Sequence, residues 1–307
     1  TPQFAFIRMA MWYASKIDKK DQVKTVNEIY ELLSTEVLCA PTPDYLYIGT
    51  PHGSAPSCVV VRCGDSNKAI GTAQHVVFEC SANGSGIGVS MELRSPLDPV
   101  AKTTVHAGKH AYYNAISAVA KESKQAGRAG AVTIHYTCLD PEVVSIARWK
   151  NPTTPPDVRL ADLDFSFGSN AAFADAVRED SDWMLVSCYY APKLWELLYQ
   201  PDKELFKAEY ERVKADESIP KKWVKARYIL HCVLRESVET RQYEHFTDEM
   251  NRHTPFKDTI YSSNLCQEVA LPTKSYENGI DDLNNPDADG EIATCNLMGI
   301  NVATVNN

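Results

Sequence analysis

Apolar residues recur at helical spacing over the first 36 residues of the chain. The first series is Phe4, Ile7 and Met11, and the second is Val23, Val26, Ile29, Leu32 and Leu33. Spacings of three and four residues place such side chains on one face of a helix. The pattern predicts two helices that introduce the domain, and Pro41 and Pro43 are expected to end this helical part.

Farther along, short apolar runs alternate with longer amphipathic stretches. The run CVVVRC at 58–63 is β-branched and predicts a buried strand, and Ser66 is a good N-cap for a helix over 67–82. The same reading predicts strands at 131–136, 163–167 and 183–187, helices at 110–124, after Pro141, at 170–178 and across 191–238, and extended segments near 260–270 and 291–297. Strands that alternate with helices indicate an α/β domain with a largely parallel sheet.

Composition narrows the class of protein. The chain has 307 residues, of which 44% are hydrophobic, as in a globular domain with a sizeable core. The formal net charge is −9 with scattered basic residues, so we expect no nucleic-acid partner. No apolar run reaches membrane-spanning length, and we expect no membrane partner and a cytoplasmic location. Because residue 1 is Thr, we also expect a natural chain that was processed or that begins earlier.

The nine cysteines are odd in number and widely spaced, which argues against a disulfide-stapled secreted fold. No Cys-x-x-Cys pair or Cys/His cluster with zinc-ligand spacing occurs, so we expect no metal site. Six cysteines are expected to be core residues: Cys39, Cys63, Cys80, Cys138, Cys188 and Cys232.

Chemically, the most informative segment is SSNLCQEVALPT at 262–273. In an extended backbone, Asn264, Cys266 and Glu268 project from one face. A thiol can supply nucleophilic or one-electron chemistry, a carboxylate can move a proton, and an amide can orient a hydroxyl group. The alternative is an ordinary strand that carries a small buried cysteine.

The chain also contains several strings that occur in the same order in one enzyme family. They are TPQF at the start, APTP at 40–43, PSCVVVRCGDS at 56–66, GIG at 86–88, KQAGRAGAVT at 124–133, NRHTPF at 251–256, SNLCQEVALPT at 263–273 and GEIATCNL at 290–297. The sequence thereby resembles class I ribonucleotide reductase large subunits. The resemblance implies a ten-stranded α/β barrel of two antiparallel halves, with a central finger loop that carries a radical cysteine. Residues 1–40 would form a helical lead-in and 41–307 the first half-barrel and finger, so we expect an incomplete barrel domain.

The resemblance also implies roles for individual residues. Cys266 would be the thiyl radical site that abstracts the ribose 3′ hydrogen, Glu268 the base for the 3′-hydroxyl proton, and Asn264 the group that orients the substrate. Cys58 and Cys295 would be the redox-active dithiol that ends as a disulfide, which requires them to lie on neighbouring strands. Thr42, Ser57 and Gly86 match substrate-binding positions, and Asn264 and Glu268 would bind the substrate as well.

Effector binding is implied as well. Asp65 and Ser66 match the site for a deoxynucleotide or ATP effector, residues 86–95 with Arg94 the first specificity loop, and Gln125 with Arg128 the second. The second loop is one residue shorter than the family pattern, and 91–94 match the first loop poorly. The alternative for Arg94 and Arg128 is that they are solvated surface arginines.

The implied activity is reduction of ribonucleoside diphosphates to deoxyribonucleotides for DNA synthesis. This chain would hold no cofactor, because a metal-containing small subunit supplies the radical, and thioredoxin or glutaredoxin would reload the dithiol. Helices at 67–82 and 110–124 would pair in a homodimer. A cobalamin-dependent reductase is an alternative, although that class usually has proline before the cysteine. The other alternative is a truncated or split-gene fragment that binds nucleotide or dimerises without activity, and we expect the isolated chain to be inactive.

Overall fold

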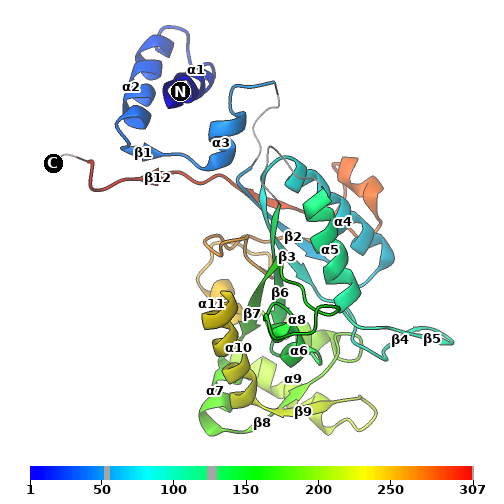
Figure 1. The fold of residues 1–307 in the computed structure, drawn as a ribbon. Coiled ribbons are helices and arrows are strands. Elements are labelled where there is room, and N and C mark those ends of the chain that lie inside the picture. The colour runs from blue at the N-terminus through cyan, green and yellow to red at the C-terminus, as the bar shows by residue number, and fades with distance from the viewer. Residues whose placement is uncertain (52–55, 123–129, 306–307) are drawn as a thin grey trace.

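The computed structural model describes residues 1–51, 56–122 and 130–305. Helices and strands alternate through most of this part of the chain (Figure 1). The elements in chain order are α1 (Pro2–Ala14), α2 (Gln22–Ser34), β1 (Leu38–Cys39), α3 (Thr42–Tyr47), β2 (Cys58–Cys63), α4 (Asn67–Ala82), β3 (Gly86–Met91), β4 (Pro99–Ala101), β5 (Thr104–Val105), α5 (His110–Glu122), β6 (Ala131–Thr137), α6 (Val143–Arg148), β7 (Leu163–Ser169), α7 (Ala171–Glu179), β8 (Asp182–Leu185), α8 (Pro192–Leu197), α9 (Lys203–Ala215), β9 (Lys222–Lys225), α10 (Ala226–Thr240), β10 (Tyr243–Phe246), α11 (Thr247–Arg252), the 3-10 helix η1 (Ile280–Asn284), β11 (Ala293–Cys295) and β12 (Gly299–Ile300).

The main sheet has six strands in the order β10-β7-β6-β3-β2-β11. The five strands from β10 to β2 are parallel, and β11 joins β2 in the antiparallel direction. The expected α/β fold is confirmed. The sheet is curled like half of a barrel, and five parallel strands followed by an antiparallel one are what a barrel of two antiparallel halves requires where its halves meet.

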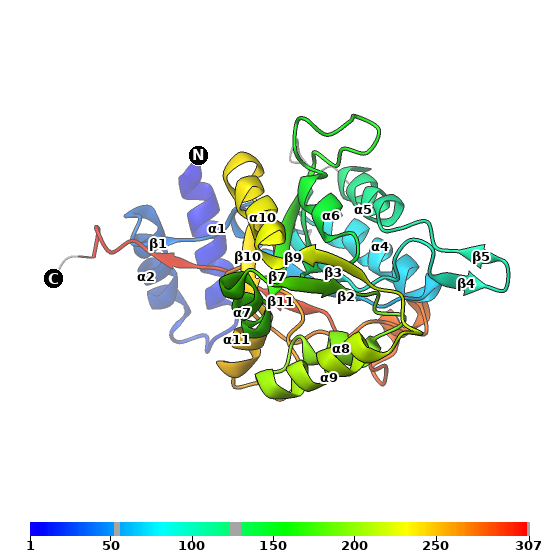
Figure 2. The same cartoon turned by 90° about the horizontal axis from the view of Figure 1, so that it is seen from below.

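The two faces of this sheet have different chemistry. Alternate residues of each strand, such as Val59 and Val61 in β2 or Ile87 and Val89 in β3, enter one large hydrophobic core on the outer face. Helices α4, α5 and α6 lie together along this side of the sheet (Figure 2). The inner face carries Gly88, Thr133 and Ser166. Both faces are covered, which explains why β2 reads as an apolar run without alternation.

Residues 261–274, called the crossing segment below, lie against the inner face. Thr133 Oγ1 in β6 donates a hydrogen bond to the Leu265 carbonyl at 2.8 Å. The segment also passes directly over β3: a Cβ atom at Gly88 would lie 1.9 Å from the Ser263 carbonyl oxygen. Only glycine leaves room for such a close backbone approach. An antiparallel bridge between Ser263 and Ala270 closes the tip of the segment.

The first helices form a separate small unit at the edge of the molecule (Figure 1). Met9 from α1, Leu33 from α2 and Ile48 after α3 make its core. The chain near its other end returns here, because β12 pairs antiparallel with β1. The helical lead-in is thus tied to the residues that follow β11, while its predicted boundary at residue 40 stays a prediction.

Several element predictions hold and others are wrong. The strand at 58–63 and the helix at 67–82 have the predicted bounds, and Ser66 Oγ caps that helix by accepting a hydrogen bond from the Ala69 amide at 3.0 Å. The helical part ends at Ser34, well before the two prolines, and Pro43 lies instead in the first turn of α3. Proline is tolerated there because the first turn needs no amide donor.

Most of the remaining differences between the predicted and the observed elements concern strands. The strand predicted at 183–187 exists as β8, but it pairs with β9 in a two-stranded antiparallel ribbon outside the main sheet. β9 itself lies within a range predicted as helical. Among the elements that the pattern did not reveal are β3 and β10 of the main sheet and the β4–β5 hairpin.

Among the described helices, none combines the length and the apolar character that crossing a lipid bilayer demands.

Candidate active site

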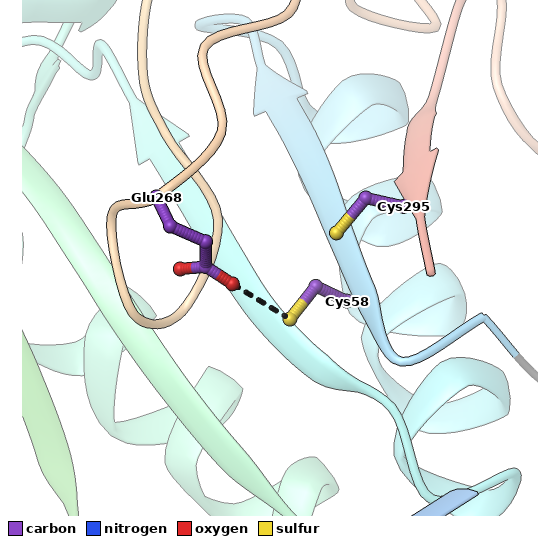
Figure 3. A group of neighbouring side chains, drawn as sticks. All are labelled: Cys58, Glu268 and Cys295. Atoms are coloured by element: carbon purple, nitrogen blue, oxygen red, sulfur yellow. Dashed lines mark hydrogen bonds between the residues drawn. The ribbon is translucent and has the colours of Figure 1, made fainter. Parts of the chain in front are cut away.

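Cys58 and Cys295 are direct partners across the antiparallel strands β2 and β11. Directly opposed residues place their side chains on the same face of the sheet. Both sulfurs are free thiols. They lie with a Glu268 carboxylate oxygen in a group whose ligand atoms are all within 4.8 Å of one another, and Figure 3 shows the three side chains converging from β2, β11 and the crossing segment. The neighbouring strands expected for this pair are therefore present.

Hydrogen bonds connect the crossing segment to both thiols. The Cys58 thiol donates to Glu268 Oε1 at 3.8 Å, and Asn264 Nδ2 donates to Cys295 Sγ at 4.0 Å. The Asn264 side chain is fully buried, and its Oδ1 accepts from the Val269 amide at 3.2 Å and from Ser263 Oγ at 3.1 Å. These two donors set the orientation of the amide and leave its nitrogen directed at the sulfur.

The backbone of the crossing segment differs from the prediction at its tip. Residues 264–267 form a turn, closed by a hydrogen bond from the Gln267 amide to the Asn264 carbonyl at 3.4 Å, and Gln267 has φ +65°. The expected extended strand is wrong here, and the alternative of a buried cysteine in a strand is wrong as well. Asn264 is buried against β3, whereas Cys266 and Glu268 are both exposed on the turn.

The surroundings of the two thiols favour their protonated forms. Burial raises the pKa of Cys58 to about 12, and burial also raises the pKa of Cys295. Both groups therefore carry their hydrogens at neutral pH. A neutral dithiol beside a carboxylate has two electrons and two hydrogens to give, with an acceptor for a proton at hand.

Besides Asn264 and Glu268, three residues were expected to bind the substrate, and two of these lie at the site. Ser57 Oγ donates to the Cys295 carbonyl at 3.0 Å and accepts from the Leu297 amide at 3.2 Å. Gly86 is directly beside Cys58 in the β2–β3 register and lies under Leu265. Thr42 is exposed at the start of α3 in the helical unit. Thr42 thus belongs to the helical unit and not to the strands that carry the thiol pair.

Three of the expected effector residues, Asp65, Ser66 and Arg94, lie at the other end of β2. Arg94 Nε donates to Asp65 Oδ2 at 2.7 Å, and the Arg94 amide donates to Asp65 Oδ1 at 3.2 Å. Arg94 is only 21% exposed, so the solvated-surface alternative is wrong for this residue. Residues 86–91 are not a loop, because they form β3. Gln125 and Arg128 lie outside the described residues.

Sequence reasoning did not single out the contact that anchors the crossing segment before its tip, at Tyr261. The Arg62 guanidinium stacks on the Tyr261 ring at 3.3 Å from its centroid and pairs with Glu92 at 3.0 Å. The signal that could have revealed it is a charged residue inside the apolar run 58–63. The inward positions of this run are Cys58, Val60 and Arg62, and the cation at the last of them meets the crossing segment.

Comparison with known proteins identifies the family of this chain. The family described as the ribonucleotide reductase barrel domain matches residues 56–307. The chain is 30% identical over 311 residues to the ribonucleoside-diphosphate reductase subunit alpha of Buchnera aphidicola subsp. Schizaphis graminum, covering 99% of this chain and 40% of that protein. It is 31% identical to the ribonucleoside-diphosphate reductase subunit alpha of Enterobacteria phage T4 over 97% of this chain and 39% of that protein. It is 30% identical to the subunit alpha of ribonucleoside-diphosphate reductase 1 of Escherichia coli K12 over 89% of this chain and 36% of that protein. The chain thus spans about 40% of the length of the first two relatives.

Proposed function

The chain belongs to the ribonucleotide reductase barrel-domain family, and we propose that it carries the dithiol and radical half of a ribonucleoside-diphosphate reductase active site. One observation supports this most strongly. Two thiols on adjacent strands, a carboxylate and a buried amide are joined by hydrogen bonds at the base of a turn that bears a third, exposed thiol.

The proposed reaction uses each of these groups. A thiyl radical at Cys266 takes the 3′ hydrogen of the ribose, and Glu268 accepts the 3′-hydroxyl proton, which eases departure of the 2′-hydroxyl group as water. Cys58 and Cys295 give two electrons and two hydrogens and become a disulfide, and the 3′ hydrogen returns to the substrate radical. The sum is a ribonucleoside diphosphate plus two thiols giving a deoxyribonucleoside diphosphate, a disulfide and water.

Contacts of the described residues fit this division of roles. Glu268 already accepts a hydrogen bond from the Cys58 thiol, so one carboxylate can exchange protons with both the substrate hydroxyl and the dithiol. Asn264 binds Cys295 through its amide nitrogen while its amide oxygen holds the turn. A shift of the turn would therefore move Glu268 and the Asn264 amide together relative to the two thiols, which are fixed on β2 and β11.

The remaining assignments are part of the same proposal. A metal-containing small subunit would supply the radical, and thioredoxin or glutaredoxin would reduce the disulfide. We assign nucleotide effectors to the end of β2 at Asp65, Ser66 and Arg94, and a homodimer contact to α4 and α5, which pack against each other. The crossing segment would be the finger of the barrel.

A single-turnover experiment tests the proposal. The full-length gene product is reduced, freed of reductant, and mixed with its radical-generating subunit and a ribonucleoside diphosphate. We expect about one equivalent of deoxyribonucleotide per active site, with loss of the Cys58 and Cys295 thiols in the same molar amount. Product formation without loss of these two thiols would contradict the assigned reductant, and no product with any ribonucleoside diphosphate would contradict the activity.

A further inference from the structure

The strongest unassigned feature is the set of ligand atoms that the site offers while its dithiol is reduced. In the described part of the chain, Cys58, Glu268 and Cys295 form a group of three potential metal ligands within 4.8 Å of one another. We propose that the reduced dithiol and Glu268 bind a thiophilic divalent cation, with Zn²⁺ the best match, and that this cation holds the dithiol in its reduced state.

Ligand geometry supports a tetrahedral ion. Zinc takes sulfur at about 2.3 Å and carboxylate oxygen at about 2.0–2.2 Å, so a tetrahedral site separates sulfur from oxygen by roughly 3.6 Å. Cys58 Sγ and Glu268 Oε1 are 3.8 Å apart, and Cys295 Sγ lies within 4.8 Å of the Cys58 sulfur and of a Glu268 carboxylate oxygen. Small side-chain rotations are enough to bring them to one centre.

The backbone supplies the rigidity that a metal site needs. Cys58 and Cys295 are fixed opposite each other by the β2–β11 ladder, so little conformational freedom is lost when both bind the same ion. Glu268 is held by the turn that the buried Asn264 closes through Val269. Asn264 also donates to Cys295 Sγ, and such a hydrogen bond to a ligand atom orients it.

The donor types decide which ion fits. Two sulfurs exclude calcium and magnesium as preferred occupants, because these ions need six or more oxygen ligands. Thiolate ligands favour zinc, and three protein ligands leave a fourth position for water. Glu268 is exposed, so an ion has access from the side of the turn.

Binding changes protonation and leaves oxidation states unaltered. Both thiols lose their protons to solvent as the two metal–sulfur bonds form, and the ion stays divalent. The same sulfur electrons cannot also make a disulfide. The ion and the disulfide therefore exclude each other, and a bound ion would slow oxidation of the pair. The metal site rests on ligand geometry and would exist even if the reductase activity proposed above were absent.

Direct zinc titration of the reduced protein tests the inference. Zinc alone is added in competition with a colorimetric chelator, after removal of reductant, and bound equivalents are compared among variants with verified folding. We expect C58S and C295S each to lose one equivalent, and E268Q to lower the affinity at least about tenfold. C63S is the matched control, because Cys63 lies in the same strand with its side chain in the outer core, and it should bind like the unaltered protein.

A second measurement needs no substitution. Oxidation of the unaltered protein to the Cys58–Cys295 disulfide should remove the same equivalent of zinc, and zinc should in turn slow that oxidation until a chelator is added. Equal zinc binding before and after the disulfide forms, or in C58S, C295S and E268Q, would overturn the inference. Disulfide formation without zinc tests the dithiol separately, so failure of the metal site and failure of the proposed reductant are distinguishable.

Discussion

Cys58 and Cys295 lie far apart in the sequence and face each other across β2 and β11, where one parallel strand meets the antiparallel strand of the sheet. Their thiols are bound by two residues of a single turn, Glu268 and Asn264. The proposed dithiol chemistry depends on the pairing of these two cysteines, which oxidation and alkylation can test.

Mild oxidation should join Cys58 to Cys295. Their side chains share one face of an antiparallel pair, where disulfides can form with little backbone movement. Peptide mapping after diamide treatment should recover this disulfide in preference to any other. Because burial raises the pKa of Cys58 to about 12, alkylation of that thiol should be slow at neutral pH and accelerate as pH rises, and the exposed Cys39 serves as the accessible thiol that shows the reagent is active. Rapid Cys58 alkylation at pH 7 would contradict the buried, protonated thiol.

Gly88→Ala should displace the crossing segment. The added Cβ would meet the Ser263 carbonyl oxygen at 1.9 Å, and backbone on both sides leaves no flexible atom to yield. We expect a loss of about 1–3 kcal/mol in the free energy of unfolding, together with loss of turnover. Gly71→Ala in α4 is the control, since a Cβ there has nothing within 4 Å and should stabilise the helix by about 0.5–1 kcal/mol. Equal stability of the two variants, measured by urea unfolding, would refute the close approach.

Some elements of the fold could be predicted from the sequence and others could not. The bounds of β2 and α4 followed from local signals, namely a short β-branched run and a Ser66 N-cap. β3 was missed because Gly86 and Gly88 resemble loop residues. Glycine is needed at both positions because the crossing segment packs directly over them. Cys39 was expected in the core but is exposed, since it lies in the two-residue strand β1.

The features of the site, likewise, could be predicted from the sequence only in part. Pairing of Cys58 with Cys295 could be expected only through the family resemblance, because no spacing rule joins such distant residues. The turn at 264–267 was not predicted, since alternation in the sequence is the same for an extended segment and for a turn that exposes Cys266 and Glu268. The Asp65–Arg94 pair joins two loops that local patterns treat separately.

His245 should make the fold sensitive to mild acid. Burial lowers its pKa from 6.5 to about 4, and burial also lowers the pKa of the adjacent His135, whose ring centroid is 5.4 Å away. The unfolded chain takes up the proton first as pH falls, so stability is full above about pH 6.5 and declines toward pH 4. We expect a contribution on the order of 2–3 kcal/mol from His245.

Unfolding curves between pH 7 and pH 4 check this expectation. His245→Gln should flatten the pH dependence, because glutamine does not titrate and can still hydrogen-bond Ser166, which lies 2.9 Å from His245 Nδ1. The exposed His75 is the control, and His75→Gln should leave the slope unchanged. Identical slopes for both variants would place the acid sensitivity elsewhere.

Asp65→Asn should weaken effector binding. The Asp65 carboxylate holds Arg94 through its side chain and backbone, and loss of charge removes the stronger of these contacts. A charge-assisted hydrogen bond contributes about 1.5–3 kcal/mol, so the dissociation constant of a deoxynucleoside triphosphate should rise at least about tenfold in calorimetry. Lys102→Ala, at the exposed turn of the β4–β5 hairpin, should bind as the unaltered protein does. Unchanged affinity in Asp65→Asn would remove the effector site from this end of β2.

Turnover by Cys266→Ser, in the full-length gene product with its radical-generating subunit, most directly tests the proposed role of Cys266 as the radical site. Serine keeps the shape of the turn, but its O–H bond is too strong to give an accessible radical. We expect no measurable deoxyribonucleotide, nearly unchanged nucleotide binding, and normal turnover for the control Cys39→Ser. Retained turnover in Cys266→Ser would contradict the assigned radical site.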